Sequence, residues 1–277
     1  MEDSSQIVVL RRRWGRLALL HLEEFSGGTG EAWFMSPLLD PGSRVMRRIA
    51  RVAIAADPPA ATLHTIPLDT ALDQPGRREQ IEWELSNLLG TFDPAMYTVE
   101  SRIPGDPPAD GIAIAIVAAM QRSLGGAVEK AGRERKLGLH HVEPAQLGAQ
   151  RVLGLKYASV LDLPIALVSV SRSRVEFGAL EHGEFVHHQL ALASKLDMIM
   201  EFLRSQLEAH PCAAIYYHGT AASSLLMNMS ESRLKVSSHL LNPFADLRVA
   251  SSFRYFHLYS GREHRFAAAF GSAVQAL

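Results

Sequence analysis

The sequence predicts an α/β fold, because short apolar runs of strand length alternate with amphipathic helical stretches along all 277 residues. The composition, 47% hydrophobic and 21% charged, is that of a globular protein with an ample core, in one large domain or two smaller ones. The formal charge of −1 gives no sign of a nucleic-acid partner. The single cysteine, Cys212, excludes an internal disulfide and favours a reducing, cytoplasmic setting.

The first half of the chain is expected to hold seven strands and two helices. Its clearest element is a helix at 77–89, where Ile81, Leu85 and Leu88 recur at the helical period and Gly90 marks the end. The other expected elements are strands at 6–10, 17–22, 52–55, 62–68, 96–103 and 111–119, a weaker helix ending at 131, and a short strand at 139–142.

The second half is expected to begin with a helix at 145–157 and to continue with a run of strands. Ser194 and Asp197, three residues apart, predict an N-terminal capping box for the helix that follows the third of these strands. The expected strands are at 165–170, 174–180, 185–192, 213–217 and near 236, with helices after 194, after 224 and at 266–277.

Membrane insertion is not expected. The longest apolar runs, at 111–120 and 161–170, fall well short of the roughly 20 residues that span a bilayer. The arginines at 11–13 followed by an apolar run imitate an export signal, but that run is short and has no small-residue cleavage site. We therefore expect the protein to reach a membrane only through a partner.

Six separated segments are informative when taken together: 79–85, 131–144, 183–186, 202–206, 241–244 and 267–273. In this order they resemble the PilM family of actin-like cytoplasmic proteins of type IV pilus assembly, and more distantly FtsA of cell division. The resemblance implies an actin-like ATPase fold of two RNase H-like subdomains with a small α+β module inserted in the first. It divides the chain into 1–51 (actin-like, first part), 52–144 (inserted module) and 145–277 (actin-like core, second part).

The family's two phosphate-binding hairpins, each written Asp-x-Gly, are altered in this sequence. The first places Leu10 and Arg12 at the Asp and Gly positions, and the second places Ser169 and Ser171 there. A side chain at the glycine blocks close approach of the backbone to a phosphate, and loss of both acids leaves Mg²⁺ without its protein ligands.

The family's adenosine loop, usually Gly-Gly-Gly-Ala, is reduced to His218-Gly219-Thr220 followed by alanine. We therefore expect a pseudo-ATPase with no catalytic residues and no ATP or Mg²⁺ cofactor. The alternative is that nucleotide binds through charged side chains, the arginines at 11–13 and Arg172.

No other catalytic or metal site is expected. The adjacent pairs His140-His141 and His187-His188 lie on strands, where neighbouring side chains point to opposite faces and cannot converge on one ion. No serine lies in a G-x-S-x-G motif.

Trp83 lies off the apolar stripe of its helix. It is either packed beneath a neighbouring segment or exposed as an anchor for a partner. We expect the packed arrangement, because the related sequences carry an aromatic residue here.

The resemblance implies a non-enzymatic, PilM-like scaffold of a type IV pilus or type II secretion-like assembly. It would be cytoplasmic and held at the inner membrane by a PilN-like partner, whose cytoplasmic tail docks against the inserted module and the adjoining core. The alternatives are a nucleotide-binding actin-like ATPase that forms filaments like FtsA, or one that acts like a sugar kinase. Whether the chain forms a homo-oligomer is left open.

Overall fold

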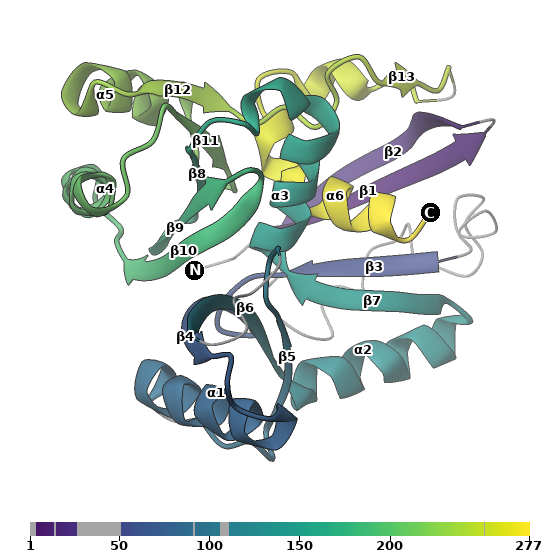
Figure 1. Cartoon of the computed structure of the whole chain (residues 1–277). Coiled ribbons are helices and arrows are strands. Elements are labelled where there is room, and N and C mark those ends of the chain that lie inside the picture. The colour runs from purple at the N-terminus through teal and green to yellow at the C-terminus, as the bar shows by residue number, and fades with distance from the viewer. Residues whose placement is uncertain (1–3, 14, 27–50, 91, 106–110, 252) are drawn as a thin grey trace.

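The structure is a computed structural model that describes residues 4–13, 15–26, 51–90, 92–105, 111–251 and 253–277. The sequence between the expected strands at 6–10 and 17–22 favours a turn at Trp14 and Gly15, and Trp14 lies outside these ranges. The predicted α/β class is confirmed, and Figure 1 shows sheets and helices in every part of the described chain. Among the helices of these residues, none is both long enough and apolar enough to cross a membrane.

A five-stranded sheet forms the upper left of Figure 1, in the order β10-β9-β8-β11-β12. β9 is antiparallel to both β8 and β10, and β11 is parallel to both β8 and β12. β8 is buried at every residue, as its unbroken apolar run predicts. The strands are β8 (Ile165–Val170), β9 (Arg174–Glu181), β10 (Glu184–Leu192), β11 (Ala214–His218) and β12 (Ser237–Leu240).

Helices cover both faces of this sheet. α4 (Leu196–Ala209) and α5 (Ser224–Leu234) pack on one face, where Ile199 and Leu226 join the core. α3 (Ala145–Lys156) packs on the other face, and α6 (Ala267–Gln275) packs on α3. Three short 3-10 helices complete this half: Ala158–Val160, Phe256–Tyr259 and Glu263–Phe266.

The N-terminal strands form a long antiparallel hairpin. β1 (Ser4–Arg13) pairs with β2 (Arg16–Ser26), with a bulge between Val9 and Leu10, and the two-residue strand β13 (Arg248–Val249) adds to β2 in parallel. The hairpin projects to the upper right of Figure 1. Below it, β3 (Arg51–Ala56) and β7 (Gly138–Pro144) form a separate parallel pair.

A small unit, here called the β4–α2 unit, occupies the bottom of Figure 1. Its antiparallel sheet has the order β4-β6-β5, and α1 covers one face through Ile81 and Leu85. Its elements are β4 (Ala61–Asp69), α1 (Gln74–Leu89), β5 (Tyr97–Arg102), β6 (Ile112–Gln121) and α2 (Arg122–Arg135). It lies within the predicted module 52–144, whose boundaries stay a prediction.

Three polar contacts join the β4–α2 unit and the segment before it to the five-stranded sheet. Arg102 pairs with Glu184 at 2.6 Å, and the backbone N–H of His188 donates to Thr65 Oγ1 at 3.0 Å. The guanidinium of Arg174 also donates to the carbonyl oxygen of Pro58.

Helix ends follow the sequence in one case and depart from it in another. Asp73 caps α1 by accepting from the N–H of Gly76, and Gly90 ends that helix with a φ of 63° that glycine adopts without strain. The capping box predicted at Ser194 is wrong. α4 begins after Lys195 with no side-chain cap, and Asp197 accepts from Arg233 of α5 at 3.0 Å instead.

Trp83 is 63% exposed, so the prediction that it is packed beneath a neighbouring segment is wrong. The reason is the orientation of α1. Ile81 and Leu85, four residues apart, face the sheet, and Trp83 lies about 200° around the helix from each of them.

α3 and α6 cross with almost no space between their backbones. A methyl group on Gly271 would lie under 3.0 Å from the carbonyl oxygen of Gly148. A methyl group on Gly148 would also lie under 3.0 Å from the carbonyl oxygen of Ala268. Small residues at both positions therefore permit the crossing.

A buried ion pair stands beside this crossing. Arg151 of α3 donates to both carboxylate oxygens of Glu143, at 2.7 and 2.9 Å, and Ser272 of α6 donates to the same carboxylate. Burial alone would raise the pKa of Glu143, but the hydrogen bonds from Arg151, His141 and Ser272 lower it to about 2.

Candidate functional site

The second of the altered hairpins is the turn between β8 and β9. Ser169, near the end of β8, is only 6% exposed. Ser171 follows β8, and both its N–H, at 3.0 Å, and its hydroxyl, at 3.4 Å, donate to the carbonyl oxygen of Arg174. The two serines are therefore held by the sheet and by their own turn.

The loop after β11 packs directly against the end of β8. Gly219 has a φ of 98°, and a Cβ there would lie 2.6 Å from the carbonyl oxygen of Val170, so that only glycine fits. The N–H of Ala221 donates to the same oxygen at 2.9 Å, and Thr220 lies between them, half-buried. The structure thus brings Gly219 and Thr220 to the serines of the second hairpin.

His218 is buried at the start of this loop. Its Nε2 lies 3.2 Å from Oε1 of Gln146, in a hydrogen bond whose direction depends on the tautomer. Burial, with the nearby His264, lowers the pKa of His218 from 6.5 to about 3. The imidazole is therefore neutral at pH 7 and offers an anion no charge.

The first hairpin lies elsewhere. Leu10 is half-buried against the main core, and Arg12 is exposed near the end of β1. In Figure 1 the turn between β1 and β2 is at the upper right, whereas the turn between β8 and β9 lies at the left, where Arg174 pairs with Leu192 at the arrowhead of β10. The structure does not bring Leu10 and Arg12 to the other five predicted positions.

The residues at these positions do not fit Mg-ATP. None of the seven carries a carboxylate, which Mg²⁺ prefers as a protein ligand. The arginines offered as substitutes do not converge either, because Arg172 lies at the second turn and those at 11–13 lie on the opposite side of the molecule.

The side chains of His187 and His188 diverge. His187 stacks on His210, just after α4, at 4.0 Å and bonds Gln206 at 3.0 Å, whereas His188 is buried 3.5 Å from Glu176. The rings of His140 and His141 instead lie 5.2 Å apart, next to an irregularity in the pairing of β7, so the prediction that this pair points to opposite faces is wrong. Within the described ranges, no group of three His, Cys, Asp or Glu side chains is arranged to hold a metal ion.

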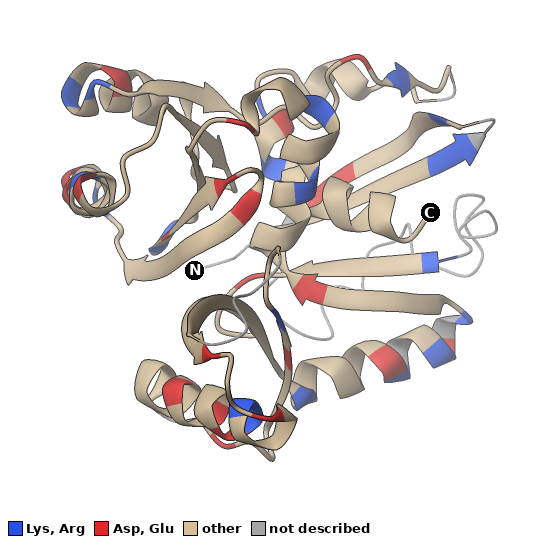
Figure 2. Cartoon of the chain, viewed as in Figure 1, with Lys and Arg blue, Asp and Glu red and all other residues tan. Residues whose placement is uncertain are grey.

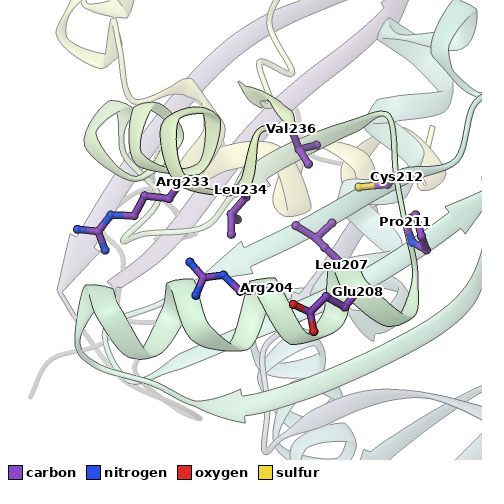
Figure 3. A pocket seen from close by; sticks show the side chains of 8 residues that line it. All are labelled: Arg204, Leu207, Glu208, Pro211, Cys212, Arg233, Leu234 and Val236. Atoms are coloured by element: carbon purple, nitrogen blue, oxygen red, sulfur yellow. The ribbon is translucent and has the colours of Figure 1, made fainter.

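A shallow cavity of about 360 Å³, not expected from the sequence, opens between α4 and α5 (Figure 3). It lies at the edge where β11 and β12 begin, whereas ligands of open α/β sheets bind where parallel strands end. Burial raises the pKa of Cys212 to about 11, so that its thiol is not a nucleophile at neutral pH. The lining residues are Arg204, Leu207, Glu208, Pro211, Cys212, Arg233, Leu234 and Val236.

Exposed apolar side chains occur on both sides of the β4–α2 unit. Ile112 of β6 is 72% exposed and begins a row with Ile114, on the sheet face opposite α1. Trp83 stands on the outer face of α1, one helical turn after Glu79. The large apolar side chains exposed in this unit are Leu72, Trp83, Leu88, Met96, Ile112 and Ile114.

Comparison with solved structures identifies the fold. The chain is similar to the PilM–PilN type IV pilus biogenesis complex, with a TM-score of 0.76 and 15% identity over 98% of this chain and 95% of that one. It is also similar to a protein from Bacteroides thetaiotaomicron described as having an actin-like ATPase fold and unknown function, with a TM-score of 0.50 and 11% identity over 85% and 90% of the two chains.

A further similar structure is the cytoplasmic domain of EpsL, an inner-membrane component of the type II secretion system of Vibrio cholerae. It has a TM-score of 0.46 and 9% identity over 79% of this chain and 84% of that one. No protein-family model matches the sequence, and no curated protein does. The expected fold is confirmed: the chain has the actin-like ATPase fold.

Proposed function

We propose that this chain, with its actin-like ATPase fold, is a non-enzymatic scaffold that binds the cytoplasmic tail of an inner-membrane protein. The assembly served would be a type IV pilus or a type II secretion-like machine, and the partner a PilN-like protein. Similarity in fold to a PilM–PilN complex supports this assignment. The scaffold would then be cytoplasmic and held at the membrane by its partner.

The chemistry of the altered loops supports a role other than hydrolysis. An ATPase needs its phosphate hairpins to face one site and needs acids for Mg²⁺ and water. Here Leu10 and Arg12 stand apart from Ser169 and Ser171, and none of these side chains is acidic. A chain with this fold but without these ATPase groups would act through surfaces that bind other proteins.

The observation that carries the proposal is the exposure of Trp83 and Ile112 on the β4–α2 unit, at 63% and 72%. Large aromatic and aliphatic side chains held on rigid elements are typical anchors of protein interfaces. α1 and β6 are such elements, because Ile81 and Leu85 fix the helix on the sheet. Trp83 and Ile112 lie on opposite faces of the unit, and a short amphipathic segment fits either face, because it buries its apolar side chains without needing a deep pocket.

A nucleotide-binding ATPase is the second candidate, favoured by one observation. Gly219 keeps the positive φ and the tight packing against Val170 that a loop near a ligand needs. The same packing also serves a purely structural loop, so the melting experiment described in the Discussion decides between them.

The proposal is tested with a fluorescent peptide of the cytoplasmic tail of a PilN-like membrane protein from the same organism. We expect the full chain to bind it, and we expect one of the two variants Trp83→Ala and Ile112→Asp, which change opposite faces of the unit, to weaken binding at least tenfold. Leu225→Ala is the matched control, because Leu225 of α5 is 62% exposed and remote in the fold. No binding of the peptide, or equal loss with the control, contradicts the proposal.

A further inference from the structure

The outer face of the β1–β2–β13 sheet is basic. Arg11 and Arg248 both pair with Ala18, one from each side, so that their side chains emerge on the same face of the sheet. Arg16 lies two residues before Ala18 on β2 and shares that face. Arg11, Arg16 and Arg248 are all exposed, and together they are called the arginine face.

These three arginines lie close together. Neighbouring strands are about 4.8 Å apart and residues two apart on a strand about 7 Å, which places the three charges within roughly 12 Å. Arg12 is also exposed, but it pairs with Leu17 and lies on the opposite face of the hairpin, so it is not part of the arginine face. Figure 2 shows this concentration at the upper right, at the end of β1 and on β13.

Among the described residues, the arginine face has no partner of opposite charge. In that part of the chain, neither a carboxylate nor a backbone carbonyl accepts a hydrogen bond from any of the three arginines. The carboxylate of Glu24 on β2 pairs instead with Arg265. The face therefore holds three positive charges that no described carboxylate pairs with, in a chain of net charge −1.

We propose that the arginine face binds the phosphate groups of anionic phospholipids and so orients the protein on a membrane surface. The guanidinium group matches phosphate oxygens with two parallel hydrogen bonds. The hairpin projects from the body and the three arginines share one of its faces, so that they reach a planar surface together.

This inference rests on the proposed function for the presence of a membrane nearby. Each basic residue at an anionic surface contributes about a fivefold gain in partitioning, so that three give only weak binding alone. Once the membrane-anchored tail is bound, the arginine face meets lipid within the same complex. The two weak affinities then combine into a stronger overall affinity for the membrane. The arginine face and the β4–α2 unit, on different parts of the molecule, would then fix its orientation with two contacts.

The test is sedimentation of the full chain with vesicles of phosphatidylglycerol and phosphatidylcholine, and with vesicles of phosphatidylcholine alone. We expect binding only to the anionic vesicles, lost on going from 50 to about 500 mM salt because the charges are screened. The triple variant Arg11→Gln/Arg16→Gln/Arg248→Gln should bind about 100-fold more weakly. The control Arg122→Gln/Arg172→Gln/Arg204→Gln removes three other exposed arginines and should bind much more tightly than the triple variant.

Equal binding by the two variants overturns the inference, as does equal binding to neutral vesicles. Binding of a 20-base-pair DNA duplex more tightly than vesicles at the same salt assigns the face to nucleic acid and also overturns it. Melting curves of both variants establish that they are folded. Tail-peptide binding without lipid separates the two proposals, because the triple variant should bind that peptide as the unchanged protein does.

Discussion

Gly148 of α3 and Gly271 of α6 meet backbone to backbone, closer than any residue with a side chain at position 271 permits. The contact brings together two helices 123 residues apart in the chain and lies beside the Glu143–Arg151 pair. It fixes how α6 packs on α3 and, through α3, on the five-stranded sheet.

Gly271→Ala should therefore destabilise the protein. The added methyl group has no space, so the helices must separate and lose packing in the main core, at a cost of more than about 2 kcal/mol in the free energy of unfolding. Gly154→Ala is the control in α3, because nothing lies within 4 Å of a methyl group there. That variant should be about 0.5–1 kcal/mol more stable than the unchanged protein. Urea unfolding followed by circular dichroism measures both, and equal effects would refute the crossing described here.

Mg-ATP should leave the melting temperature unchanged. A ligand at a hundred times its Kd adds about 2.7 kcal/mol to the free energy of unfolding, which is easily measured as a shift in Tm. We expect no shift at millimolar Mg-ATP, because the altered positions offer no acidic ligand. A clear rise in Tm that is abolished by Arg12→Ala or Arg172→Ala would establish a nucleotide site instead.

Trp83→Ala should hardly change stability. The side chain is 63% exposed and removing it leaves little cavity, so we expect a loss under about 1 kcal/mol. Leu85→Ala, on the same helix but fully buried, should cost about 2–5 kcal/mol. Thermal melts of the two variants check the orientation of α1, which would be wrong if Trp83→Ala were the more damaging change.

The Glu143–Arg151 pair should make stability depend on pH in the acid range. The pKa of Glu143 falls from 4.5 when unfolded to about 2 when folded, so its contribution is fully present above pH 4.5 and is lost as the pH falls toward 2. A depression of this size corresponds to roughly 3 kcal/mol.

The variant Glu143→Gln isolates this contribution. Its deficit in the free energy of unfolding, relative to the unchanged protein, should shrink as the pH falls from 6 to 2.5. The exposed Glu100→Gln is the control and should show no such trend. A deficit for Glu143→Gln that stays constant over this range would show that the pair does not control the titration.

Local pattern was enough to predict most of the elements. β8 has the predicted bounds, 165–170, because an apolar run between a proline and a turn specifies a buried strand without help from the rest of the chain. Gly90 ends α1 for the same reason: the left-handed conformation at that position is a local requirement. The capping box at Ser194 failed because the path of the chain out of β10 places the helix start one residue later.

The candidate site was predictable only one loop at a time. The sequence identified Ser169, Ser171 and Gly219 as members of altered loops, and the structure places these three together. It gave no information on where Leu10 and Arg12 lie relative to them, because that depends on how separate sheets pack. The prediction that Trp83 is packed failed for a similar reason, since periodicity defines the apolar stripe of a helix but not what covers its remaining surface.

The contacts of Arg102 with Glu184, Thr65 with His188 and Pro58 with Arg174 join residues 82 to 123 positions apart. Closing such long loops costs chain entropy before any contact forms, so we expect these contacts to be made late in folding. The β4–α2 unit, whose strands and helices are close in sequence, should then acquire its own structure before it docks on the five-stranded sheet. Pulsed hydrogen exchange during refolding would see amides of β4 and β6 protected before the N–H of His188.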